Sequence, residues 1–185
     1  MTVNNLEIRA LSTVEEIKDS TVEGYAIKFN SESRDLGGFI EIIEPTAFDG
    51  VDMSDVRAFM DHDAGKLLGR TASGTLELTV DERGVKFKLD LPNTTVGRDA
   101  LELVKRGDLN QCSFGFTVAE DEWYKQGDKI YRSIKKIGNF FEISLVSIPA
   151  YDDTDVSVAK RGLNQAVNDL EKEKLSLELD LLGLA

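Results

Sequence analysis

The stretch LELTVDERGVKFKL, which runs from Leu76 to Leu89, has the pattern of a β-hairpin. Apolar and polar residues alternate on both sides of the segment DERG, as expected where successive side chains of a strand point to opposite faces. Lys86 and Lys88 then fall on the polar face. The apolar positions of both strands share the opposite face, formed by Leu76, Leu78, Val80, Val85, Phe87 and Leu89.

Further strands are predicted on both sides of this hairpin. A proline at the start of residues 45–48 indicates a short helical turn, and residues 99–107 predict a short helix that Thr94 or Thr95 caps and Gly107 ends. The sequence therefore predicts an α+β protein, a mainly antiparallel β-barrel with a few short helices. Alternating or apolar runs mark six more strand candidates, at residues 21–30, 39–44, 55–62, 113–118, 130–137 and 140–148.

The last part of the chain changes to a helical period. Apolar residues recur there at spacings of four and three with charged residues between them, which predicts an amphipathic C-terminal helix. We therefore expect a barrel domain over residues 1–158 and a helical tail over residues 159–185. The tail either packs on its own domain or docks on another helix as a coiled coil, and three heptads are too few to decide. The apolar positions are Leu163, Val167, Leu170, Leu177, Leu181 and Leu184.

The composition limits the classes of partner. Over 185 residues, 34 acidic and 22 basic side chains give a formal charge of −12, which disfavours binding to the phosphates of nucleic acid. The single cysteine, Cys112, cannot form an internal disulfide, and no Cys/His cluster predicts a metal site. No apolar run approaches the roughly 18 residues of a membrane span. We expect a chain that needs no nucleic acid, no membrane and no cofactor.

The chain has one histidine, His62, and this restricts the catalytic chemistry open to it. Imidazole has the unperturbed pKa nearest neutrality, so a serine hydrolase built from this chain would use His62 as its base. Ser113 is the candidate nucleophile, because its strand buries Phe114 and Phe116 on one face and presents the serine on the other. Glu142 stands inside an apolar strand, where a carboxylate needs a partner, and it is the candidate that orients the imidazole.

Each of these roles has an alternative in the sequence. Asp61 or Asp63 could orient the imidazole instead of the glutamate, or form a solvated turn around it. The thiol of Cys112 is intrinsically a better nucleophile than a hydroxyl, but its register with the two phenylalanines directs it to the core as an inert thiol. Backbone amides around Gly115 or the guanidinium of Arg70 are candidate donors to an oxyanion.

Several short motifs follow one another between residues 20 and 155. They are GYA (24–26), EPTAF (44–48), DHD (61–63), LGRT (68–71), GTL (74–76), LP (91–92), CSFGF (112–116) and EISLVSIPA (142–150). In this order they resemble the prohead, or capsid maturation, serine proteases of tailed phages. The resemblance implies a β-barrel related to the herpesvirus maturation protease. It places the family's histidine on His62, its serine on Ser113 and its acid on Glu142.

The resemblance also implies a function. It implies a serine endopeptidase that cuts scaffold segments from capsid proteins, and then itself, inside the immature prohead in the host cytoplasm. Its partners would be the major capsid protein precursor and scaffold segments, and the sequence leaves a homo-oligomer open. The alternative is a non-catalytic capsid assembly or scaffold-binding protein on a related barrel, in which the tail does the binding and Ser113 is dispensable.

Overall fold

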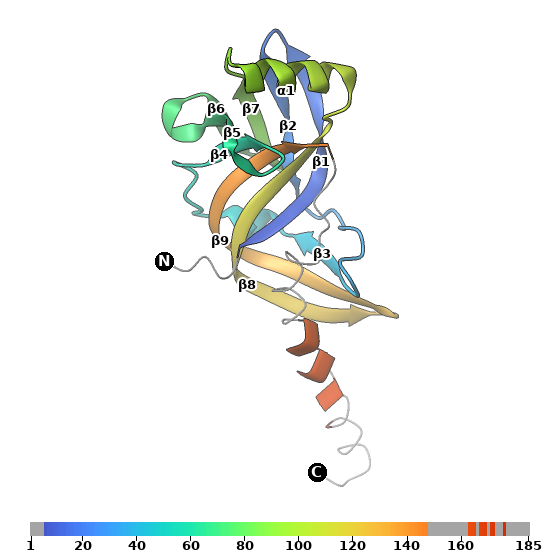
Figure 1. Cartoon of the computed structure of the whole chain (residues 1–185). Helices are drawn as coiled ribbons and strands as arrows, with labels where there is room; N and C mark the ends of the chain where they lie inside the picture. The colour runs from blue at the N-terminus through green and yellow to red at the C-terminus, as the bar shows by residue number, and fades with distance from the viewer. Residues whose placement is uncertain (1–5, 148–162, 166, 170, 173–175, 177–185) are drawn as a thin grey trace.

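The computed structural model describes residues 6–147, 163–165, 167–169, 171–172 and 176. Up to residue 147 its elements are mostly strands, with one α-helix and two 3-10 helices (Figure 1). They are β1 (Glu7–Lys18), β2 (Thr21–Lys28), β3 (Ile40–Ile43), η1 (Pro45–Phe48), β4 (Arg57–Met60), β5 (Asp63–Arg70), η2 (Thr71–Ser73), β6 (Leu76–Val80), β7 (Gly84–Asp90), α1 (Thr95–Arg106), β8 (Gln111–Gln126) and β9 (Lys129–Val146).

The strands form one curled sheet, a half-barrel (Figure 1). Along the sheet they follow the order β5-β4-β9-β8-β1-β2-β7-β6, and β3 pairs with β9 beside this path. Six pairings of the described strands are antiparallel, whereas β3 and β4 both run parallel to β9. The predicted sheet with few short helices is confirmed, but a closed barrel is not found, because the described order has two ends.

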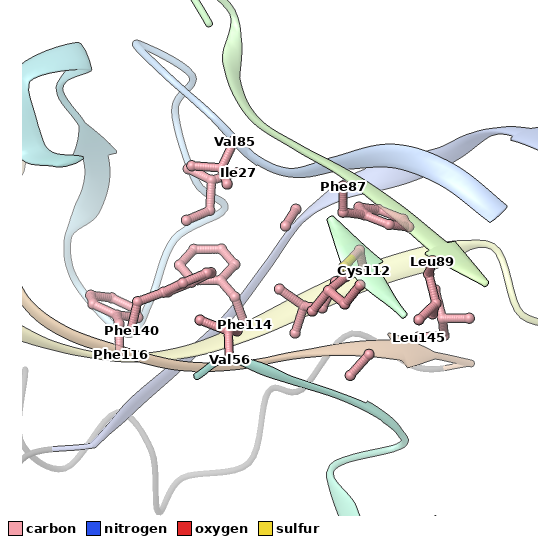
Figure 2. Packing of buried hydrophobic residues seen from close by; sticks show 14 of the residues in the cluster. Ile27, Val56, Val85, Phe87, Leu89, Cys112, Phe114, Phe116, Phe140 and Leu145 are labelled. Carbon is pink, nitrogen blue, oxygen red and sulfur yellow. The ribbon is translucent and has the colours of Figure 1, made fainter. Parts of the chain in front are cut away.

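The core lies on the face of the sheet that receives the aromatic rings of β8 (Figure 2). The rings of Phe114 and Phe116 lie 5.2 Å apart, and Phe140 of β9 packs edge-on against Phe48 at 5.4 Å. Cys112 belongs to the same cluster. Burial of each such aromatic side chain contributes about 1.5–3 kcal/mol. Because Phe114 and Phe116 point into this core, Ser113 between Cys112 and Phe114 points to the opposite face of β8.

The hairpin and the helix predicted from the sequence are both present. β6 and β7 pair in an antiparallel ladder on either side of the turn that starts at Asp81. α1 begins at Thr95, four residues before the predicted start, because the hydroxyl of Thr94 accepts a hydrogen bond from the amide of Gly97 at 3.1 Å. Gly107 ends the helix in the left-handed conformation, with φ 82°.

Three features of the sheet differ from the sequence predictions. β1 was not predicted, because its first residues bury charges instead of apolar side chains, and β5 was not predicted, because half of its residues are exposed. The predicted strands 130–137 and 140–148 are one strand, β9, as far as Val146. The strand continues past Gly138 because the amide of Asn139 donates to the hydroxyl of Thr117 at 2.9 Å where β8 shifts its register.

Two arginines and two glutamates form a buried ionic cluster of Glu7, Arg9, Glu41 and Arg132. Arg9 donates to Glu41 at 2.7 Å and to Glu7 at 2.6 Å. Arg132 donates to the same two carboxylates at 3.0 and 2.6 Å. Burial alone would lower the pKa of Arg9, but the carboxylates of Glu41 and Glu7 hold it above its ordinary value. The cluster fastens the start of β1 to β3 and β9.

Only part of the predicted C-terminal tail is described. Residues 163–165, 167–169, 171–172 and 176 are helical, and Leu163 packs against Leu36 and Phe39. The domain boundary predicted after residue 158 lies outside the described residues, as do four of the six apolar positions predicted for the helix, Leu170, Leu177, Leu181 and Leu184. No helix in the described part of the chain has the length and apolarity that crossing a membrane requires.

Candidate active site

His62 lies in a tight turn immediately after β4. Asp61 and His62 both have left-handed backbones, with φ of 50° and 58°, which cost an L residue roughly 1–2 kcal/mol each. The turn is held in place from β9, because the amide of Asp61 donates to the carbonyl of Leu145 at 3.0 Å. The carboxylate of Asp61 in turn accepts from the amide of Ser147 at 3.2 Å. The parallel pairing of β4 with β9 thus delivers the histidine to the face of β9.

The imidazole of His62 contacts the carboxylate of Glu142 on β9. Its Nδ1 lies 2.6 Å from Oε1 of Glu142, and the two side chains are 20% and 10% exposed. The other carboxylate oxygen, Oε2, accepts a hydrogen bond from the hydroxyl of Ser144 at 2.7 Å. The sheet makes room for this carboxylate at Gly115, which faces Glu142 from β8. A Cβ atom at Gly115 would lie 3.0 Å from Cγ and 3.2 Å from Oε1 of Glu142.

Ser113 lies on the neighbouring strand, on the same face of the sheet. In the β8–β9 register it stands opposite Ser144, two residue pairs along from Gly115 and Glu142, so both pairs lie on the same face. Successive side chains on one face are about 7 Å apart along a strand. Ser113 is fully buried, with 0% exposure, and its hydroxyl donates to the backbone carbonyl of Arg9 at 2.7 Å.

The hydrogen bonds determine the protonation of the imidazole. An ionised carboxylate only accepts hydrogen bonds. With Glu142 ionised, Nδ1 of His62 therefore carries a hydrogen and donates it in the hydrogen bond to Oε1. In a neutral imidazole, Nε2 is then an acceptor. This atom is buried, and none of the residues that the structure describes donates to it. Glu142 thus orients the imidazole with its Nε2 unpaired, and the hydroxyl of Ser113 donates to β1 and not to this nitrogen.

The sequence alternatives lie elsewhere. Asp63 accepts from the amide of Gly65 at 2.8 Å and pairs with Lys66 at 3.5 Å, so its carboxylate is used within its own strand. Cys112 points into the core, where burial raises the pKa of its thiol, which argues against a reactive thiolate. The guanidinium of Arg70 is half-exposed and paired with Asp55, whose hydrogen bonds hold the pKa of Arg70 above its ordinary value.

A groove of about 440 Å³ lies beside the end of β4. None of His62, Ser113 and Glu142 lines it, although one of its residues precedes the histidine by two positions. The candidate site is therefore the face of the sheet and not this groove. Within the described residues, no group of three or more His, Cys, Asp or Glu side chains could hold a metal ion. The groove is lined by Met60, Lys66, Val96, Asp99, Glu102 and Leu103.

Two contacts of the site were not predicted from the sequence. Ser144 had a usable signal, because a serine two residues after a strand carboxylate lies on the same face. The carbonyl of Arg9 had none, because every residue carries such a group and only the pairing of β1 with β8 brings this one to Ser113.

Comparisons with known proteins agree with these observations. A family model described as caudovirus prohead serine protease matches residues 4–169. Among solved structures, the capsid assembly protease of bacteriophage T4 has a similar fold, with a TM-score of 0.56 and 8% sequence identity. The similarity covers 77% of this chain and 97% of that one, and at this identity it concerns the fold alone. No curated protein sequence matches the chain.

Proposed function

This chain belongs to the caudovirus prohead serine proteases, and we propose that it is the endopeptidase that cuts scaffold segments from capsid proteins, and then cuts itself, inside the immature phage head. The observation that carries the proposal is the pairing of His62 with Glu142 at 2.6 Å, in which Nε2 receives no hydrogen bond from any residue that the structure describes. A non-catalytic capsid assembly or scaffold-binding protein has no need of an imidazole that a buried carboxylate orients.

The proposed reaction uses three side chains. Nε2 of His62 takes the proton of the Ser113 hydroxyl as its oxygen attacks the peptide carbonyl, and Glu142 stabilises the imidazolium that forms. The imidazolium then gives the proton to the leaving amine, and water releases the acyl group from Ser113 by the same route. For the first step the hydroxyl must leave the carbonyl of Arg9, which accepts its hydrogen bond in this structure. Rotation about one side-chain bond starts that change.

The proposed partners are the major capsid protein precursor and its scaffold segments, met inside the prohead in the host cell. With a formal charge of −12, the chain is not drawn to acidic partners by charge. Shape and apolar contacts are therefore the expected basis of recruitment.

We expect the capsid precursor to be shortened when it is co-expressed with the wild-type chain. Peptide hydrolysis removes a whole segment, so intact-mass spectrometry of the assembled subunits should show a lower mass that corresponds to one cleavage site. Precursor expressed alone is the control and should keep its full mass. Proheads that assemble with the chain present but contain only full-length subunits would favour the non-catalytic assembly role instead.

Replacing Gly115 with alanine is expected to slow cleavage with little change in stability. The new Cβ would press on Cγ and Oε1 of Glu142 at 3.0 and 3.2 Å, so the carboxylate must move by a few tenths of an ångström. Small misplacements of catalytic groups are costly, and we expect a loss of about tenfold in the rate of subunit shortening.

The matched control is Gly138→Ala, whose new Cβ would meet the hydroxyl of Thr117 at 2.9 Å, away from the site. Equal cleavage rates for the two variants would show that the absence of a side chain at Gly115 is not needed to position the Glu142 carboxylate.

A further inference from the structure

Ser144 belongs to the candidate site, yet the proposed reaction does not use it. Its side chain is fully buried, and its hydroxyl donates to Oε2 of Glu142 at 2.7 Å. Oε1 of the same carboxylate lies 2.6 Å from Nδ1 of His62. Each oxygen of the carboxylate therefore has a donor of its own, one from the imidazole and one from the serine.

The position of Ser144 follows from the strand. Residues two apart on a strand point to the same face, so a serine two positions after Glu142 reaches its carboxylate. β9 lies between β8 and β4, and its backbone is held on both sides. A glutamate carboxylate otherwise rotates broadly about its last bond, and one that is buried without a donor loses a stabilising contact. The hydroxyl of Ser144 removes this freedom.

We infer that Ser144 is a positioning residue for the proposed reaction. Its hydroxyl fixes the rotation of the Glu142 carboxylate. Oε1 then keeps accepting the hydrogen bond from Nδ1 of His62, and Nε2 remains free to act as the base. The catalytic consequence rests on the proposed function. The orientation of the imidazole is a property of the folded chain and can be measured without a substrate.

The test compares Ser144→Ala with Ser133→Ala. Ser133 is a matched control, because it is buried on the same strand and its hydroxyl also donates to a glutamate, Glu44, at 2.7 Å. Both variants remove the hydroxyl of a buried serine and its bond to a carboxylate, but only one of these bonds lies in the site. We expect Ser144→Ala to shorten capsid precursor about tenfold more slowly than wild type, and Ser133→Ala to keep the wild-type rate.

Nuclear magnetic resonance of the untagged chain provides the second readout. Because His62 is the only histidine, its Nδ1 proton gives a single imidazole signal. We expect this signal to shift or broaden in Ser144→Ala, where the carboxylate turns more freely, and to stay unchanged in Ser133→Ala. A purely structural role would affect both variants alike.

Two results would overturn the inference. In one, Ser144→Ala matches Ser133→Ala in both the cleavage rate and the Nδ1 signal. In the other, Ser144→Ala abolishes cleavage with an unaltered Nδ1 signal, which would make its hydroxyl the nucleophile. Should the wild-type chain cleave nothing, the proposed function would fail, while the Nδ1 signals of the two variants would still decide whether Ser144 positions the carboxylate.

Discussion

Ser113→Ala and His62→Ala are each expected to abolish the shortening of capsid subunits, by a factor of at least about 10⁴. The first change removes the oxygen of the proposed nucleophile, and the second removes the only imidazole of the chain, which is the proposed base. Since the two groups act as one unit, the double variant should lose little more than either single variant. Intact-mass spectrometry of subunits co-expressed with each variant measures the effect.

Ser133→Ala is the control for a general loss of folding, because it removes a buried hydroxyl of β9 outside the site. It should shorten the precursor at the wild-type rate. Shortened subunits in the presence of Ser113→Ala, with the variant folded, would exclude Ser113 as the nucleophile and with it the proposed mechanism.

Glu41→Gln is expected to lower the free energy of unfolding by about 3–5 kcal/mol. Glu41 is fully buried and accepts hydrogen bonds from Arg9 and Arg132, so the substitution leaves Glu7 as the one carboxylate that both guanidinium groups share, while the partly exposed Asp121 still pairs with Arg132. The cost comes from the uncompensated buried charge, because glutamine keeps nearly the same volume. Urea denaturation followed by fluorescence of Trp123, the only tryptophan, measures the change.

Glu77→Gln provides the comparison on the surface. Glu77 pairs with Lys88 at 3.4 Å, and both side chains are largely exposed. Solvent screens such a pair, so its loss should change the free energy of unfolding by no more than about 0.5 kcal/mol. If both substitutions shifted the urea midpoint equally, the buried cluster would not be a determinant of stability.

The parts of the fold that depend on local signals could be predicted from the sequence. The hairpin around Asp81 alternates regularly, and α1 has a capping threonine and a terminal glycine. The parts that depend on distant partners could not. The first residues of β1 are buried through charge pairing with Glu41 and Arg132, which no periodicity reveals. The parallel pairing of β4 with β9 likewise depends on a tertiary arrangement.

The candidate site shows the same division. A carboxylate inside an apolar strand needs a partner, which predicts the pairing of Glu142 with His62, and the two side chains lie 2.6 Å apart in the structure. The hydrogen bond of the Ser113 hydroxyl could not be predicted in this way. It depends on which backbone carbonyl the neighbouring strand places beside the serine, and every residue has such a carbonyl.

The left-handed turn at Asp61 and His62 has a consequence for protein engineering. Asparagine and glycine adopt this backbone conformation more easily, so a redesign for thermal tolerance would choose these two positions early. Such a redesign would discard the only imidazole of the chain. A variant library selected for heat resistance alone should therefore become enriched in folded proteins that lack the histidine of this turn. Under the proposed mechanism, stability and activity therefore make opposing demands on His62.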